Sequence, residues 1–158
     1  MQIPLVGGGF TEIDEADYTD EVRSMKWRRA IDKRSETRTC YAVFSRVGEM
    51  ICLHRLIMRA TTGQTVDHRD RDGLNNHRDN LRLCTLSQNR ANGRQWKQPA
   101  SGFRGVYASG AKWMACISDN GHRVRYLGAF ISKEDAARAY DSAALERWGE
   151  FSSLNFQL

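Results

Sequence analysis

The sequence has no run of apolar residues that could cross a bilayer, which takes about 18 to 20 consecutive positions. Its start also lacks a basic stretch followed by a long apolar core, so no secretory signal is expected. Hydrophobic residues make up 41% of the 158 positions and charged residues 27%, which excludes a disordered chain. The composition predicts a globular, cytoplasmic protein of one ordinary domain or two small ones, with no membrane partner.

Closely spaced cysteine pairs are also missing. The sequence has four cysteines and no Cys-x-x-Cys pair. Structural zinc sites usually place two cysteines within one short turn, and disulfide frameworks belong to small secreted proteins. We therefore expect buried free thiols, with a zinc site or a disulfide framework as the alternatives. The four positions are Cys40, Cys52, Cys84 and Cys116.

Basic residues are absent from the first 22 positions, although the whole chain has a net charge of +5. By subtraction, the rest of the chain carries +11, because this segment holds six acidic residues and no basic one. Lysine and arginine contacts to phosphate supply the salt-sensitive part of nucleic-acid affinity, so a polyanionic partner is expected. Basic charge alone is more often a solvated surface. The six acidic residues are Glu12, Asp14, Glu15, Asp17, Asp20 and Glu21.

The rest of the chain is organised around residues 66–92, which read VDHRDRDGLNNHRDNLRLCTLSQNRAN. The apolar residues around Val66 and at 81–84 fit two short strands, with glycine and asparagine turn signals between them. Thr85 can then cap a short helix. Strand, loop, strand and helix make a compact frame for a metal site. Five side chains in this frame could carry chemistry: Asp67, His68, His77, Asn80 and Asn89.

These residues resemble the ββα-metal motif of the HNH endonuclease family, in the H-N-N variant of phage and intron-encoded homing endonucleases. Twelve positions separate His68 from Asn80, and nine separate Asn80 from Asn89, as in that variant. The resemblance implies Asp67 and Asn89 as metal ligands. It implies His68 as the general base and Asn80 as the residue that holds the loop. Mg²⁺ is the implied ion, with Mn²⁺ as the alternative, and the implied setting is a bacterial or phage-infected cell.

Phosphodiester hydrolysis explains these residue types independently of the family. The reaction needs an activated water and a cation on the leaving oxygen. A carboxylate and a carboxamide supply the oxygen ligands that a hard divalent ion prefers, and a neutral imidazole can take a proton from water. Strand alternation would turn Asp67 and His68 to opposite faces unless the strand ends or bends there. An isolated Asp-His pair, by contrast, is usually part of a solvated loop.

Two other histidines have open roles. His77 could contact a phosphate or assist the metal, but a supporting or surface role is favoured. His54 begins a His-Arg-Leu run that resembles the run upstream of the motif in phage HNH proteins. For His54 we favour a structural or supporting role over catalysis.

The segment before the motif predicts an accessory layer with no assigned chemistry. Residues 3–6 and 10–13 fit two strands around a Gly-Gly-Gly turn, and Asp14 can cap a helix over residues 15–25. Trp27 could anchor that helix. Residues 40–44 and 50–53 fit two further strands joined near Gly48, and a short helix follows from His54.

Residues 93–101 predict a linker, because they are rich in turn-forming and basic residues and Pro99 discourages a helix. Arg94 and Lys97 lie in this linker and Arg90 lies just before it, and the three could lie along DNA. A merely solvated connection is the open alternative.

The last third predicts a three-stranded sheet and one helix. Residues 103–108, 112–118 and 123–130 fit strands, and the Asn-Gly turn before the third is a strong hairpin signal. Ser132 opens a helix with a Ser-x-x-Asp capping pattern, and Gly149 is a plausible stop. One helical stripe is apolar: Ala137, Tyr140, Ala144 and Trp148.

Five short runs in this region, FRGV, KW, YLGAF, AARAYD and LNF, resemble the Apetala-type, or ethylene-response-factor, DNA-binding domain. In that family the sheet lies in the DNA major groove, so the resemblance implies a double-stranded DNA partner. Several positions of charged family contacts hold other residues here, so the plant target sequence should not be inherited. Alternatively, these side chains merely cover an exposed face. The candidate DNA contacts are Arg104, Tyr107, Lys112, Arg123 and Arg125.

The predicted protein is of the α+β class, with an HNH nuclease module at 1–92, a linker at 93–101 and an Apetala-type domain at 102–158. The expected activity is metal-dependent cleavage of duplex DNA, one strand per active site. A monomer would nick, and a homodimer could break both strands. A non-catalytic DNA-binding regulator is the alternative, and a nuclease for RNA or branched substrates is a further one.

Overall fold

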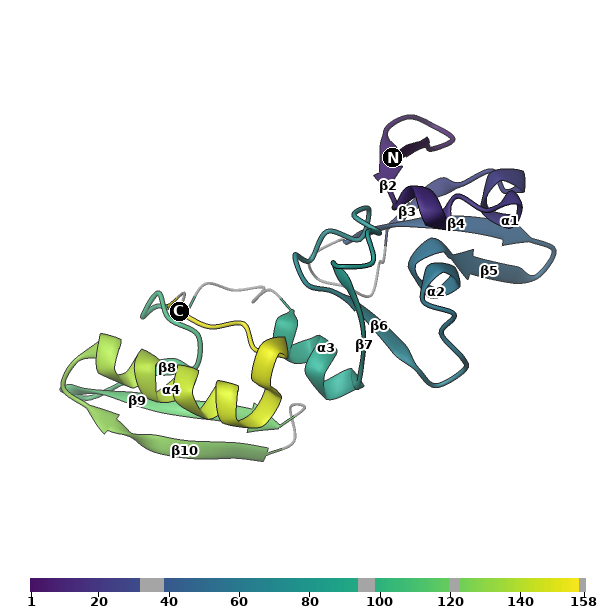
Figure 1. Cartoon of the computed structure of the whole chain (residues 1–158). Helices are drawn as coiled ribbons and strands as arrows, with labels where there is room; N and C mark the ends of the chain where they lie inside the picture. The colour runs from purple at the N-terminus through teal and green to yellow at the C-terminus, as the bar shows by residue number, and fades with distance from the viewer. Residues whose placement is uncertain (32–38, 94–98, 120–122, 157–158) are drawn as a thin grey trace. The chain divides into compact units, whose positions relative to one another are not determined.

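The computed structural model describes residues 1–31, 39–93, 99–119 and 123–156. The chain divides into two compact units, Met1–Thr85 and Leu86–Leu158, whose elements are labelled in Figure 1. Both units contain helices, and all the sheets are antiparallel, so the predicted α+β class is confirmed. Within these described ranges, no helix is both long and apolar enough to cross a membrane.

The described residues of the first unit form three small sheets. β1 (Gln2–Pro4) pairs with β2 (Phe10–Glu12), and β6 (Thr65–His68) pairs with β7 (Leu81–Cys84), as predicted. The third sheet has the order β3 (Arg28–Ile31), β4 (Cys40–Arg46), β5 (Glu49–Cys52), and α2 (Leu53–Ile57) follows it. β3 was not predicted because its Arg-Arg-Ala-Ile sequence is largely exposed and has no apolar alternation.

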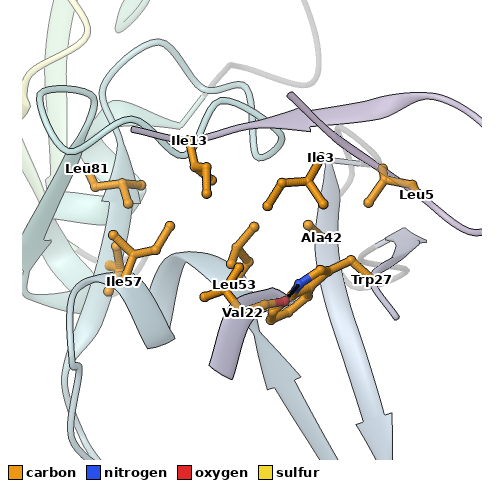
Figure 2. Packing of buried hydrophobic residues seen from close by; sticks show 10 residues of the cluster. Ile3, Leu5, Ile13, Val22, Trp27, Ala42, Leu53, Ile57 and Leu81 are labelled. Atoms are coloured by element: carbon orange, nitrogen blue, oxygen red, sulfur yellow. Dashed lines mark hydrogen bonds between the residues drawn. The ribbon is translucent and has the colours of Figure 1, made fainter. Parts of the chain in front are cut away.

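The core of the first unit combines side chains from distant parts of the sequence. Figure 2 shows Ile13 from the N-terminal segment above Leu53 of α2. Trp27 is 1% exposed, and its indole Nε1 donates to the backbone oxygen of Val22 at 3.0 Å, so it anchors the segment as expected. The N-terminal segment is therefore an integral part of this unit's core. The buried members are Ile3, Leu5, Ile13, Val22, Trp27, Ala42, Leu53, Ile57, Val66 and Leu81.

The helix predicted over residues 15–25 with an Asp14 cap is wrong. The segment forms a 3₁₀ turn, η1 (Glu15–Asp17), followed by α1 (Asp20–Ser24), whose cap is Thr19. The Asp14 carboxylate makes no capping bond. It instead accepts a hydrogen bond from the backbone N–H of Arg78 at 2.8 Å, which draws it towards a loop far along the sequence.

The second unit begins with α3 (Leu86–Asn92) and continues into the sheet β8 (Val106–Ser109), β9 (Lys112–Asp119) and β10 (Arg123–Phe130). α4 (Lys133–Trp148) lies across one face of this sheet, and η2 (Gly149–Phe151) follows (Figure 1). The predicted capping by Ser132 is confirmed, since its hydroxyl accepts from two backbone N–H groups of the first turn. β8 begins at Val106 rather than at the predicted residue 103, because the left-handed Gly105 (φ 74°) precedes it.

The end of the chain is tied back to the start of this sheet. Asn155 receives a hydrogen bond from the Arg104 backbone N–H at 2.6 Å and donates its Nδ2 to the Arg104 oxygen at 3.1 Å. The buried Asp141 of α4 accepts from the backbone N–H groups of Asn155 and Phe156, at 2.9 and 3.0 Å. These contacts explain why the AARAYD and LNF runs occur together: Asp141 of the first run binds the backbone of Asn155 and Phe156 in the second.

α3 packs with the second unit. The indole Nε1 of Trp148 donates to the Ser87 hydroxyl at 3.1 Å. The two compact units meet after Thr85, and the predicted extent of the nuclease module, residues 1–92, stays a prediction. Residues 94–98 of the predicted linker lie outside the described residues.

Candidate active site

The β6–β7 hairpin places Asp67 and His68 on different faces, as strand alternation requires. Asp67 lies opposite Arg82 in the register, and its Oδ2 accepts from the guanidinium Nε at 2.9 Å and NH2 at 2.8 Å. Both side chains of this ion pair are buried. The guanidinium therefore fixes the orientation of the carboxylate.

His68 lies on the face that joins the core of the first unit. Its ring is buried, with centroids 5.1 Å from His54 and 5.9 Å from Tyr41. Its Nε2 is 3.1 Å from the Oδ1 atom of Asn76. Burial lowers the pKa of His68 below its ordinary value, while the Asn76 hydrogen bond and the nearby Asp70 carboxylate oppose the shift. A neutral imidazole is the form that can act as a base near pH 7.

Asn80 fastens the loop between the two strands. Its Oδ1 accepts from the backbone N–H of Asp70 at 3.0 Å, and its Nδ2 donates to the Asp70 carboxylate at 2.9 Å. The same Nδ2 donates to the backbone oxygen of Asn75 at 2.7 Å. Burial opposes ionisation of Asp70, but hydrogen bonds from Asp72, Asn75 and Asn80 hold its pKa below the ordinary value. These contacts are those that a loop-holding role requires.

His77 links the same loop to the N-terminal segment. Its Nδ1 is 2.8 Å from Asp14, and the neighbouring Arg78 forms an ion pair with the buried Asp17, with its NH2 at 2.6 Å from Oδ1. The hydrogen bond from the Arg78 backbone, followed by the contact with His77, lowers the pKa of Asp14. The His77 contacts are those of a supporting residue.

His54 is buried beside His68 and Tyr41. Burial, followed by repulsion from His68 when it is protonated and from Arg55, lowers its pKa to about 3. Within the described residues, its Nδ1 is the buried side-chain nitrogen or oxygen atom that has no hydrogen-bond partner. A histidine with this pKa stays neutral near pH 7 and packs against the candidate base.

Of the predicted metal ligands, Asp67 belongs to β6 in the first unit and Asn89 to α3 in the second. Their convergence on one cation stays a prediction. Among the described residues, no group of three or more His, Cys, Asp or Glu side chains could hold a metal ion. Of the four cysteines expected to be buried, Cys116 is buried, and Cys40, Cys52 and Cys84 are half-buried.

The sequence interpretation missed two residues of this site, Thr11 and Asn76. Both are fully buried, and Asn76 touches the candidate base directly. The Asn75-Asn76 pair in the loop was interpreted as a turn signal, which was the available hint. Thr11 left no local signal, because its partner lies 65 positions away.

In the second unit, the strand register places the candidate DNA contacts on different faces of the sheet. Tyr107 pairs with Met114 and Lys112 with Ser109, on the sheet face away from α4. Arg125 pairs with Ile117, whose side chain packs against α4. Arg125 therefore lies on the sheet face that α4 covers, where its own side chain is exposed. The outer face also carries the exposed Tyr126.

The other basic residues predicted to contact DNA differ in burial and in hydrogen bonding. Arg104 is half-buried, and its guanidinium NH1 donates to the backbone oxygen of Gly93 at 3.0 Å. Burial raises the pKa of Tyr140, and the adjacent Arg104 opposes that shift. Arg90 is exposed on α3. Arg94, Lys97 and the side chain of Arg123 lie outside the described residues.

Comparison with known proteins supports both resemblances. The family model described as HNH endonuclease matches residues 52–91. A protein named as an HNH endonuclease from Acanthamoeba polyphaga mimivirus is 37% identical over 93 residues, 57% of this chain and 46% of its own length. An ethylene-responsive transcription factor of Arabidopsis thaliana is 33% identical over 108 residues, 65% of this chain and 40% of its own.

A second Arabidopsis protein, an AP2-like ethylene-responsive transcription factor, is 50% identical over 46 residues, 29% of this chain and 15% of its own length. The chain thus spans less than half the length of each of these relatives. No solved structure matches the chain. Residues 52–91 are thus similar to the HNH endonuclease family, and the chain is also similar to plant ethylene-responsive transcription factors, so the resemblances drawn from its sequence are confirmed.

Proposed function

We propose that the chain is a metal-dependent DNA endonuclease of the homing type, which hydrolyses phosphodiester bonds in duplex DNA. The observation that carries the proposal is the setting of His68. A buried imidazole with a lowered pKa stands beside a loop that Asn80 fastens, within the segment that the HNH family model matches. Such an imidazole is uncharged at neutral pH and can accept a proton from water.

The donor set suits a hard divalent cation. Asp67 would supply a carboxylate oxygen and Asn89 a carboxamide oxygen, and Mg²⁺, with Mn²⁺ as the alternative, prefers such ligands. The ion pair with Arg82 holds the Asp67 carboxylate in one orientation. When bound, a divalent ion would stabilise the negative charge that develops on the phosphate and on the leaving 3′ oxygen.

The protein's own side chains perform the remaining tasks. His68 takes a proton from the attacking water, which makes the water oxygen nucleophilic towards phosphorus. Asn80 keeps the loop next to His68 in one conformation through its three hydrogen bonds. Cleavage of the bond to the 3′ oxygen then leaves a 5′-phosphate and a 3′-hydroxyl end. A monomer that uses this site should nick one strand, and a homodimer could cut both.

The second unit is proposed to hold the enzyme on duplex DNA. Its outer sheet face carries Tyr107 and Lys112 without cover from α4, and a three-stranded sheet of this kind can enter the major groove. The similarity to two plant transcription factors supports this role. We place the activity in the cytoplasm of a bacterial or phage-infected cell.

A plasmid-nicking assay tests the proposal. Supercoiled DNA should become open circles with Mg²⁺ and remain supercoiled with EDTA. His68→Ala should abolish nicking while DNA affinity in a gel-shift assay stays within about twofold, because the imidazole contributes to the chemical step. Robust nicking by His68→Ala would remove the assigned base.

A non-catalytic DNA-binding regulator is the second candidate, favoured by the similarity to the transcription factors. It would bind duplex DNA and leave it intact under every metal condition. Comparing duplex, branched and RNA substrates in the same assay separates a DNA nuclease from one that prefers RNA or junctions.

A further inference from the structure

A series of three hydrogen bonds connects the candidate base to a backbone carbonyl. The His68 Nε2 atom is 3.1 Å from Asn76 Oδ1, Asn76 Nδ2 is 2.8 Å from Thr11 Oγ1, and Thr11 Oγ1 is 2.7 Å from the Leu74 oxygen. Asn76 and Thr11 have 0% exposure. Water therefore cannot replace a member of this series, and the direction of each bond has to be satisfied by the protein itself.

The direction of every bond follows from the carbonyl end. A carbonyl oxygen only accepts, so the Thr11 hydroxyl uses its single hydrogen on the Leu74 oxygen. The Thr11 oxygen can then only accept, and Asn76 must present its NH2 group to it. The Gly73 carbonyl, 3.5 Å from the same Nδ2 atom, favours this orientation as well. The amide oxygen of Asn76 consequently faces His68.

An amide oxygen has no hydrogen to donate, so the His68 Nε2 must carry one. In the neutral ring, the lone pair then lies on Nδ1. We propose that Asn76 and Thr11 are positioning residues that hold His68 in the Nε2–H tautomer, so that Nδ1 takes the proton from the attacking water. This inference rests on the nuclease function proposed above. After the transfer, the imidazolium carries a proton on each nitrogen, and Nε2–H still donates to Asn76.

The opposite tautomer is disfavoured by the same contacts. It would point the Nε2 lone pair at the amide oxygen across 3.1 Å, on the side of the ring where Asn76 and Thr11 are fully buried and unpaired polar atoms are most unfavourable. The hydrogen bond also fixes the rotation of the ring. A base that is misplaced by about 1 Å can lose about 100-fold in rate, so the positioning has a measurable effect.

The N-terminal strand thereby takes part in the site. Thr11 belongs to β2, which is also joined to the loop by two backbone bonds of 2.8 Å, from Glu12 N–H to the Leu74 oxygen and from Asn76 N–H to the Glu12 oxygen. These bonds fix the position of β2 relative to the loop and so place the Thr11 hydroxyl within hydrogen-bond distance of the Asn76 amide. The segment to which no chemistry was assigned from the sequence thus orients the base.

The first test determines the tautomer in the unaltered protein and uses a variant only to assign the signals. In uniformly ¹⁵N-labelled full-length protein at neutral pH, long-range ¹H–¹⁵N correlations of the histidine rings identify which nitrogen of each neutral ring is protonated. His68→Gln assigns the signals by their disappearance. The expected result is a protonated Nε2 in His68, with a hydrogen that exchanges slowly because it is buried and bonded. A neutral His68 protonated at Nδ1 would overturn the proposal.

The second test compares Thr11→Val, which keeps the shape but loses the hydroxyl, with the matched control Thr11→Ser, which keeps the hydroxyl. Thr11→Val should lower kcat by about 10- to 100-fold with little change in KM, and its Nε2–H signal should exchange faster. Thr11→Ser should restore both. Equal behaviour of the two variants in rate and exchange would contradict the role of Thr11, and a ring that keeps its Nε2–H in a chain that cuts no DNA would overturn the nuclease proposal instead.

Discussion

Acid should destabilise the first unit through His54, by an amount that the structure determines. The ring is buried, and its pKa is lowered to about 3 from an ordinary value of 6.5. The unfolded chain binds this proton below pH 6.5, whereas the folded chain excludes it until about pH 3. The folded state is therefore fully favoured above the unfolded pKa, and it loses stability as the pH falls below that value.

The magnitude follows from the two pKa values. One pKa unit corresponds to about 1.4 kcal/mol, so lowering the pH from about 7 to about 5 should reduce the free energy of unfolding by about 2 kcal/mol through His54 alone. Buried His68, whose pKa is also lowered, adds to the loss in the same direction. A decrease of this size is a large fraction of the roughly 5 to 15 kcal/mol that holds a domain together.

Urea unfolding followed by ¹H–¹⁵N spectra measures this change for the first unit separately. His54→Gln should be less stable at neutral pH, because the buried amide lacks a complete set of partners, but its loss on acidification should be smaller by about 2 kcal/mol. His122→Gln, in the second unit, removes one histidine and keeps His54, so it should lose as much as the wild type. Equal losses in the wild type and His54→Gln would refute the reasoning.

Three further outcomes are expected. Asn80→Ala removes three hydrogen bonds of the loop, so it should reduce the free energy of unfolding in urea by about 1 to 3 kcal/mol and lower the nicking rate. Unchanged nicking would contradict its loop-holding role. Gly105→Ala should destabilise the second unit by about 3 kcal/mol, because the residue has φ 74° and the new Cβ would clash with the Tyr140 ring. An unchanged melting temperature would contradict this packing. Lys112→Ala should weaken duplex binding and reduce the slope of log affinity against log salt concentration by about 1. The control Lys133→Ala, on α4, should leave this slope unchanged. Equal slopes for the two variants would show that the outer sheet face is not the DNA interface.

Local patterns were sufficient for many elements of this fold. The β6–β7 hairpin and the sheet of the second unit follow from alternation and turn residues, and the helix after Ser132 begins at the predicted capping group. The spacing of His68, Asn80 and Asn89 was enough to indicate an HNH segment, which the family comparison matches. Such signals depend on neighbours within one or two turns, so they are readable without a tertiary structure.

Local patterns failed where a distant partner competed for a side chain. Asp14 is a residue type that commonly caps helices, yet its carboxylate accepts a hydrogen bond from the Arg78 backbone and the helix starts at Asp20 instead. β3 has no apolar alternation, and its pairing with β4 is a property of the folded sheet. A sequence motif could not indicate Arg125 as facing α4 either, since the face depends on the register with β9.

The sequence by itself determined the residue types for the chemistry: an imidazole, a carboxylate and two carboxamides at a characteristic spacing. The tertiary structure decided how the imidazole is used. It buried His68 and His54 together, which lowers both pKa values, and it brought Thr11 to Asn76 across 65 positions. Proton affinity and hydrogen-bond direction depend on desolvation and on the nearest polar atoms in space, and for these residues those atoms come from remote parts of the chain.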